Sequence, residues 1–240
     1  MGGGLSATSL GFHHMKKYVV IISSLILAFF LLYCVKAQNS KDKIYLMNKN
    51  YEVQMAIYHL YPTKSAKIVM FGNSLTFNLN WSEALNRKDL VNRGIIGDIT
   101  QGYLKRIDYV LKLEPQVCFI EGGINDLYAN FKVDDIYNNY IKIIELLKDN
   151  KTMPIVQSTI FVSSKRDDYQ NKNIQVKELN NKLESYCTAK GIKFIDLNRL
   201  LSSAGKLKEE YTYDGVHLNA DGYILWIKEV QNALELIYPV

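Results

Sequence analysis

The chain is poor in the side chains that bind metals or form disulfides. It has three cysteines and four histidines among 240 residues, and none of them is grouped at the spacing of a metal site. Cys34 falls in an N-terminal apolar run, Cys118 in an apolar strand and Cys187 on a helix. We favour two buried thiols at Cys118 and Cys187 over a disulfide between them. The sequence therefore gives no indication of a metal centre.

The chain also lacks a strong charge imbalance. Lys16, Lys17 and Lys36 are three of its 29 basic residues and lie in the first 37 residues, which hold no acidic residue. The remainder has 26 basic and 24 acidic residues, and the basic ones are scattered as on an ordinary solvated surface. We therefore expect no nucleic-acid partner. No repeat, low-complexity tract or linker interrupts the chain, which favours one domain.

One long apolar run is present, near the N-terminus. Lys16-Lys17 precedes an uncharged run over 18–35, and Val35-Lys36-Ala37 offers small residues at the −3 and −1 positions of a signal-peptidase site. These features are typical of a secretory signal. An uncleaved anchor is the alternative, because 18 residues just reach the length that spans a membrane. In either case residues 1–37 predict export to the periplasm or the cell exterior, and membrane contact is expected only if this segment stays uncleaved.

After the export segment, helical patterns alternate with short apolar runs. Apolar residues at spacings of three and four predict one helix from Ile44 to Tyr58, ended by Pro62 and packed on the domain as residues 38–63. Residues 64–240 would then form the main domain. Its five expected strands are 67–71, 89–93, 116–121, 154–162 and 193–197.

The alternation of these strands with helices of ten or more residues predicts a parallel sheet. The strands are apolar without clean alternation, as is typical of strands covered on both faces. We therefore expect an α/β fold, a three-layer αβα sandwich around a five-stranded parallel sheet. Gly191 would end one helix and Asn219 would cap the last.

Polar motifs follow these strands where open α/β folds bind their ligands, at the carboxyl edge of the sheet. Ser74 follows the first strand, Gly97 the second and Asn125 the third, while Asp214 and His217 precede the last helix. A serine needs an adjacent base to act as a nucleophile. His217 is the natural candidate, since the other histidine beyond the export segment, His59, sits beside the apolar stripe of a helix.

Acyl-transfer chemistry gives each of these residues a role. His217 would take the proton of Ser74 and later return it to the leaving alcohol, with Asp214 holding the imidazole tautomer. The oxyanion would be bound by the backbone N–H groups of Ser74 and Gly97 and by the side-chain amide of Asn125. Each motif alone has a plainer explanation as a turn or a loop-stabilising pair. Their joint order along the chain favours the catalytic interpretation.

This set of motifs resembles the SGNH, or GDSL-like, hydrolases. The matching blocks are residues 72–75 (Gly-Asn-Ser-Leu), 92–98 (Asn-Arg-Gly-Ile-Ile-Gly-Asp), 123–126 (Gly-Ile-Asn-Asp) and 214–218 (Asp-Gly-Val-His-Leu), in family order within residues 44–236. The chain looks most like the branch related to platelet-activating-factor acetylhydrolase catalytic subunits and bacterial carbohydrate O-acetylesterases.

The resemblance implies a flavodoxin-like SGNH hydrolase fold that needs no metal or organic cofactor. It also implies a catalytic set of Ser74, Asp214 and His217, with Ser74, Gly97 and Asn125 forming the oxyanion hole. Asn73 departs from the family pattern, because it stands where the GDS form has an aspartate.

We expect an exported serine esterase that removes short acyl groups, acetyl foremost, from a hydroxylated substrate such as a carbohydrate. One alternative is a lysophospholipase or other lipid-ester hydrolase, which the polar loop 163–173 disfavours. Another is an inactive glycan-binding module, which would be favoured only by a missing member of the catalytic set.

Overall fold

The computed structural model describes residues 44–238 together with Leu27, Phe29 and Phe30. The chain divides into two compact units, residues 1–44 and residues 45–240, and the second carries the fold described below. Apart from Leu27, Phe29 and Phe30, which are exposed, the expected export segment lies outside the described residues, as does Cys34. Within the described part of the chain, no helix is both long and apolar enough to cross a membrane.

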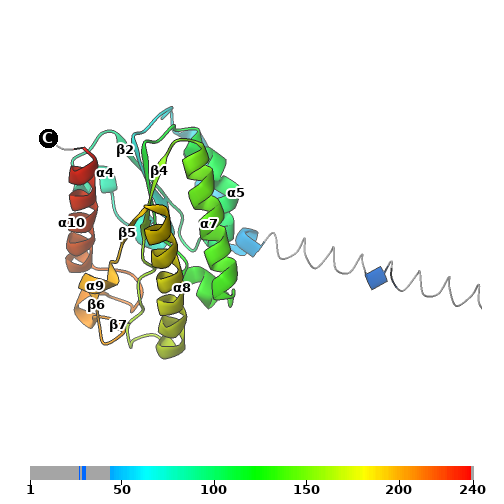
Figure 1. Cartoon of the computed structure of the whole chain (residues 1–240), viewed down its shortest axis with the longest axis vertical. Helices are drawn as coiled ribbons and strands as arrows, with labels where there is room; N and C mark the ends of the chain where they lie inside the picture. Colours follow the sequence, from blue (N-terminus) through cyan, green and yellow to red (C-terminus); the bar gives the residue numbers. More distant parts are fainter. Residues whose placement is uncertain (1–26, 28, 31–43, 239–240) are drawn as a thin grey trace, which may run out of the picture. The chain divides into compact units, whose positions relative to one another are not determined.

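A five-stranded parallel sheet forms the centre of the second unit, as expected from the alternation of strands and helices (Figure 1). Its spatial order is β2-β1-β3-β4-β5, the order of flavodoxin-like folds. The strands are β1 (Ile68–Gly72), β2 (Leu90–Gly94), β3 (Val117–Ile120), β4 (Met153–Gln157) and β5 (Lys193–Ile195).

Helices and short turns precede, connect and follow the strands. They are η1 (Ile44–Met47), α2 (Lys49–Leu60), α3 (Ser74–Phe77), α4 (Trp81–Ala84), α5 (Thr100–Leu111), α6 (Ile124–Tyr128), α7 (Val133–Asp149), α8 (Tyr169–Lys190), α9 (Asn198–Leu201), η2 (Glu209–Tyr211) and α10 (Ala220–Ile237). A small antiparallel pair, β6 (Ser202–Ser203) and β7 (Lys206–Leu207), lies between α9 and η2.

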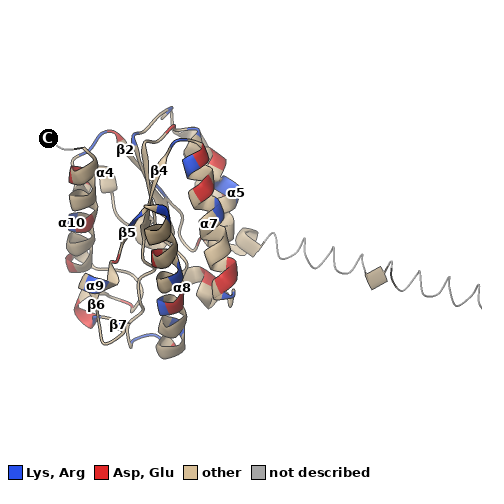
Figure 2. Ribbon diagram, viewed as in Figure 1, with Lys and Arg blue, Asp and Glu red and all other residues tan. Residues whose placement is uncertain are grey.

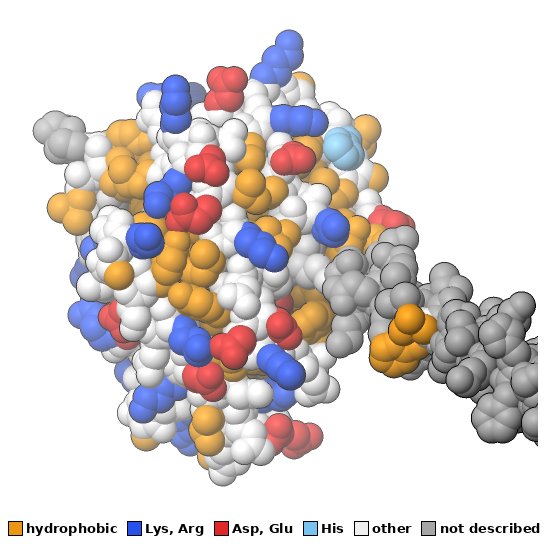
Figure 3. Space-filling model, turned by 45° about the vertical axis from the view of Figure 1, so that its right-hand side comes forward, with side chains coloured by type: hydrophobic (Ala, Val, Ile, Leu, Met, Phe, Trp, Pro, Cys, Tyr) orange, Lys and Arg blue, Asp and Glu red, His pale blue; other side chains and the backbone are white. Residues whose placement is uncertain are grey.

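Two apolar cores cover the two faces of the sheet. Side chains alternate along a strand, so Val69 and Phe71 of β1 pack toward α5, α7 and α8, while Met70 packs toward Trp81 of α4 and Trp226 of α10. The three layers of the sandwich are thus present as expected. Acidic and basic side chains are interspersed on the surface of this unit, in agreement with the near-balanced charge (Figures 2 and 3).

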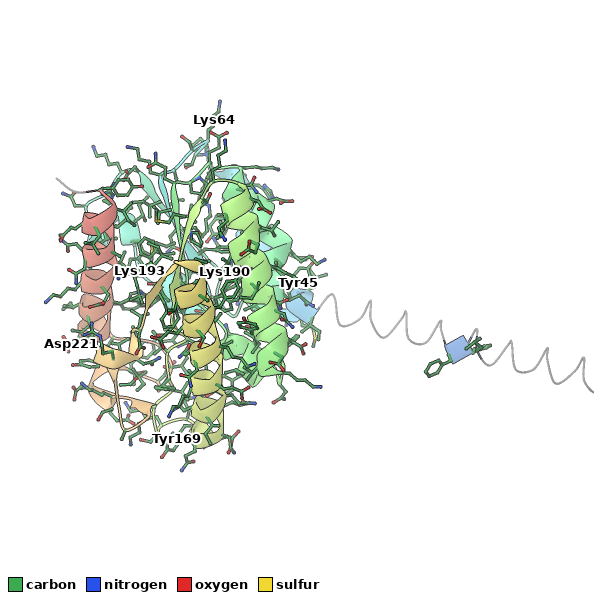
Figure 4. The ribbon with its side chains drawn as sticks, viewed as in Figure 1. Tyr45, Lys64, Tyr169, Lys190, Lys193 and Asp221 are labelled. Atoms are coloured by element: carbon green, nitrogen blue, oxygen red, sulfur yellow. The ribbon has the colours of Figure 1, made fainter. Side chains whose placement is uncertain are left out.

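The helix starts show which edge of the sheet is the carboxyl edge. Figure 4 labels Tyr169, the first residue of α8, and Asp221, in the first turn of α10, at one end of the sheet, and Lys64, which precedes β1, at the opposite end. The loops that leave the strands toward Tyr169 and Asp221 carry the motif residues.

Several local predictions are confirmed. Gly191 ends α8 in the left-handed conformation at φ 64°, and the Asn219 side chain accepts a hydrogen bond from the Gly222 N–H at the start of α10. Cys118 and Cys187 are both buried free thiols. The helix expected from Ile44 to Tyr58 is interrupted, because Asn48 separates η1 from α2.

The fourth strand is shorter than the expected range 154–162, because β4 ends at Gln157. The chain beyond it stays buried although it leaves the strand. Asparagine side chains replace the sheet as its hydrogen-bond partners: the Thr159 N–H donates to Asn180 Oδ1, and the Val162 N–H donates to Asn173 Oδ1. An apolar run whose backbone N–H groups are bonded by side chains has the same sequence pattern as a strand.

Candidate active site

The turn between β1 and α3 places Ser74 at the carboxyl edge. Ser74 is the first residue of α3, and the Asn73 side chain caps this helix by accepting a hydrogen bond from the Leu75 N–H at 2.8 Å. Asn73 thereby fills a local structural role at the position where the GDS form has an aspartate. Gly72 is required in this turn, since an added Cβ would lie 2.0 Å from Thr76 Oγ1.

Ser74, His217 and Asp214 lie in one hydrogen-bonded line. Ser74 Oγ is 3.0 Å from His217 Nε2, across 143 positions of sequence, and His217 Nδ1 is 2.6 Å from Asp214 Oδ2. The side chain of His217 is 27% exposed and that of Asp214 is 37% exposed, so solvent and substrate can reach the line. This is the geometry that a serine needs to lose its proton to a base.

The Asp214 carboxylate is held in its ionised form. Partial burial opposes ionisation, but hydrogen bonds from the His217 ring and from the backbone N–H groups of Val216 and His217 outweigh it. The pKa of Asp214 therefore lies below its ordinary value. An ionised carboxylate at Nδ1 favours the tautomer that leaves Nε2 free to accept a proton.

The loop that carries His217 is braced by residues that sequence reasoning missed. The Thr212 hydroxyl donates to the His217 carbonyl at 2.7 Å and accepts from the Gly215 N–H at 2.9 Å. The Tyr213 ring stacks on the His217 imidazole with centroids 5.8 Å apart. The one signal in the sequence is their position directly before Asp214. His59, in contrast, packs edge-on against Tyr109.

The three N–H donors expected for an oxyanion lie at the start of α3, in the loop after β2 and in the first turn of α6. No described residue accepts a hydrogen bond from the backbone N–H of Ser74 or Gly97. The Asn125 side-chain amide donates one N–H to the Asp98 carbonyl at 2.9 Å, which orients the group and leaves its second N–H. Gly97 adopts φ 73°, a conformation that favours glycine. These groups are the three donors expected from the sequence.

The Gly97 loop is supported from two sides by contacts that the sequence did not reveal. Asn48, at the start of α2, donates from Nδ2 to the Ile96 carbonyl at 2.8 Å. On the other side, the buried Arg106 pairs with Asp98 at 2.8 Å and also donates to the carbonyls of Arg93 and Gly72. Arg106 thus ties the Gly97 loop to the end of the strand that precedes Ser74.

A second polar row is buried near the carboxyl ends of β1, β3 and β4. It consists of Thr76, Glu121 and Gln157, which are at most 1% exposed. Glu121 and Gln157 follow the paired residues Ile120 and Val156 of neighbouring strands and so lie side by side. Thr76 Oγ1, both Glu121 carboxyl oxygens and Gln157 Nε2 have no hydrogen-bond partner among the described residues.

Burial raises the pKa of Glu121 to about 8, so this carboxyl group is largely protonated at neutral pH. Helix α10 covers the same face of the sheet, with Trp226 Nε1 donating to Gln157 Oε1 at 2.6 Å. Among the described residues, no group of three or more His, Cys, Asp or Glu side chains could hold a metal ion.

Comparison with known proteins agrees with the geometry of the site. The family model described as GDSL-like Lipase/Acylhydrolase matches residues 70–225, a range that contains Ser74, Gly97, Asn125, Asp214 and His217. The crystal structure of a GDSL-like lipase from Bacteroides thetaiotaomicron is 25% identical, with a TM-score of 0.69 over 78% of this chain and 98% of that one. An acetyl xylan esterase shares the fold at 20% identity, with a TM-score of 0.60 over 70% of this chain and 99% of that one.

One relative of similar sequence is named as a cytidylyltransferase and not as a lipase or an esterase. An N-acylneuraminate cytidylyltransferase of Streptococcus agalactiae is 27% identical over 180 residues, which are 72% of this chain and 41% of the relative. The chain therefore spans about two fifths of the length of that relative.

Proposed function

The chain belongs to the GDSL-like lipase/acylhydrolase family, and from this premise we propose that it is an esterase that removes short acyl groups, acetyl foremost, from the hydroxyl groups of a carbohydrate. The observation that carries the proposal is the hydrogen-bonded line from Ser74 through His217 to Asp214. Ser74 is the nucleophile, His217 the base and Asp214 the group that orients the base.

The reaction proceeds in two halves. Ser74 Oγ attacks the ester carbonyl carbon and passes its proton to His217 Nε2, which returns it to the alcohol that leaves. Water then attacks the acyl group on Ser74, with His217 again as the base, and the carboxylic acid departs. In both halves the negative oxygen is bound by the N–H groups of Ser74, Gly97 and Asn125.

Two observations support a small acyl group on a sugar. The loop from residue 163 to residue 168, which borders the His217 loop, is polar and mostly exposed, and it offers no apolar surface for a long chain. Proteins that resemble this chain include an acetyl xylan esterase and an N-acylneuraminate cytidylyltransferase, whose names both refer to sugars. We also propose that the enzyme is exported, on the basis of the sequence of residues 1–37.

A series of aryl esters tests the acyl preference. We expect kcat/KM of the purified enzyme to be highest for p-nitrophenyl acetate and to fall as the acyl chain lengthens to decanoyl. The opposite order would favour a lipid ester as the substrate. Absence of turnover on every ester would favour a glycan-binding role instead.

A further inference from the structure

One arginine, Arg166, contacts both the loop that carries His217 and helix α6, which carries Asn125. Arg166 lies in the loop between β4 and α8, and its aliphatic stem packs over Gly215, two residues before His217. Arg166 Cγ lies 2.9 Å from the position that a Cβ on Gly215 would occupy. The Ser163 N–H donates to the Gly215 carbonyl at 2.8 Å, which fixes the loop of Arg166 to the loop that carries His217.

The guanidinium group of Arg166 reaches helix α6. Its guanidinium carbon lies 5.7 Å from the centre of the Tyr128 ring. Tyr128 is on α6, three residues after the oxyanion donor Asn125, and residues at this spacing share a helix face. The Arg166 side chain therefore extends from the loop of the proposed base His217 to α6, the helix of the proposed oxyanion donor Asn125.

Arg166 differs from the neighbouring lysines, because the ammonium group of each of these lysines is bonded to an oxygen of a described residue. Lys165 forms an ion pair with Glu209 at 3.3 Å, Lys172 donates to the Leu127 carbonyl at 2.8 Å, and Lys206 donates to Ser164 at 3.0 Å. No carboxylate of the described residues forms an ion pair with Arg166, although Asp167 and Asp168 follow it in the sequence.

We infer that Arg166 binds a carboxylate on the alcohol half of the substrate, so that the natural substrate is an acyl ester of an acidic sugar. The inference rests on the proposed function and names its substrate class. A guanidinium binds a carboxylate through two parallel N–H donors, and the face of Tyr128 shields one side of this group. The one positive charge of the guanidinium matches a monoanion such as a carboxylate.

A matched pair of sugars tests the inference. The probes are chemically O-acetylated methyl glucoside and methyl glucuronoside, which differ in the carboxylate, with p-nitrophenyl acetate as a third substrate. We expect wild-type enzyme to prefer the acetylated glucuronoside, and we expect this preference to weaken at high salt. Arg166→Gln should lower kcat/KM on the glucuronoside by roughly tenfold to a hundredfold, mainly through KM, and so remove the preference.

Two further variants make the result specific. Arg166→Lys keeps the charge without the planar fork and should restore part of the preference, whereas Lys206→Gln removes a nearby cation that is already bonded and should keep all of it. Equal losses on both sugars in Arg166→Gln would assign this residue to packing over Gly215 and overturn the inference, as would a wild-type enzyme without preference. If wild type fails even on p-nitrophenyl acetate, the proposed function falls and the role of Arg166 falls with it.

Discussion

Two polar rows lie near the carboxyl ends of the strands, and they differ in hydrogen bonding and in access to solvent. The outer row, Ser74, His217 and Asp214, is hydrogen-bonded from end to end, and its His217 and Asp214 side chains are partly exposed while Ser74 is buried. The inner row of Thr76, Glu121 and Gln157 is fully buried, and several of its polar atoms have no hydrogen-bond partner in the described part of the chain.

The difference separates chemistry from stability. A group that must gain and lose a proton needs a fixed partner and access to solvent, as His217 has. A buried carboxyl group such as Glu121 remains neutral instead, because ionisation without a countercharge would be costly. We therefore expect changes in the outer row to act on turnover and changes in the inner row to act mainly on stability.

Removal of the nucleophile should give the largest effect. Ser74→Ala deletes the oxygen that attacks the ester, and we expect kcat on p-nitrophenyl acetate to fall by roughly four to six powers of ten. Ser82→Ala, which alters an exposed hydroxyl bonded to Asn80, is the matched control and should retain wild-type turnover. Wild-type turnover in Ser74→Ala would remove Ser74 from the mechanism.

Loss of Asn125, the side chain proposed to bind the oxyanion, should rank second. Asn125→Ala removes the side-chain N–H that Asp98 orients, and we expect kcat to fall by about two to three powers of ten, with a smaller change in KM. Steady-state kinetics on acetyl esters provide the measurement. A variant that changed only KM would show that this amide contacts substrate without stabilising the charge.

In the inner row, Glu121→Gln should change how stability depends on pH. The pKa of Glu121 is raised from an ordinary 4.5 to about 8 in the folded protein, so between these values the folded state holds a proton that the unfolded state has released. The contribution of Glu121 to the free energy of unfolding is thus fully present below about pH 4.5 and is lost as pH rises toward 8, by at most about 1.4 kcal/mol per pH unit.

Glu121→Gln cannot ionise and should lose this pH dependence. Denaturant unfolding of wild type and Glu121→Gln at pH 5 to 8 isolates the effect, because the buried Asp126, whose pKa is raised to about 7, is present in both. A stability difference that stays constant across this range would show that Glu121 titrates normally. A loss of turnover in Glu121→Gln without any change in stability would show that the inner row also takes part in catalysis.

The smallest effect is expected at Asn48, which supports the outer row from a distance. Asn48→Ala removes both the cap of α2 and the hydrogen bond to the Ile96 carbonyl. We expect a loss of about 1 kcal/mol in the free energy of unfolding and a modest decrease in kcat. Asn48→Asp keeps the cap acceptor but cannot donate to Ile96, so unchanged turnover in this variant would exclude support of the Gly97 loop.

The outer row could be predicted from the sequence because its members are marked by position. Ser74 follows a strand, and His217 is one of only two histidines beyond the export segment. The parallel sheet brings the ends of its strands to one edge. The contact between Ser74 and His217 is therefore the expected one, while the catalytic roles assigned to these residues remain predictions until turnover is measured.

The inner row could not be predicted, because its members become neighbours only through strand register. Glu121 looks in the sequence like the polar end of a strand, and nothing marks Gln157 as its neighbour. The break at Asn48 was hidden for a related reason, since the apolar spacing continues from η1 into α2 across it. The contacts of Arg166 could not be predicted either, because the sequence shows only a polar loop and does not show where this loop lies.

The most direct measurement is labelling of the folded protein with a fluorophosphonate, which reacts with a serine only where a base activates it. We expect one adduct per chain, located on Ser74 by peptide mass spectrometry, and much slower labelling of the His217→Ala variant under the same conditions. Absence of an adduct on Ser74 in folded wild-type protein, or an equal rate of labelling without the imidazole, would contradict the claim that His217 activates Ser74.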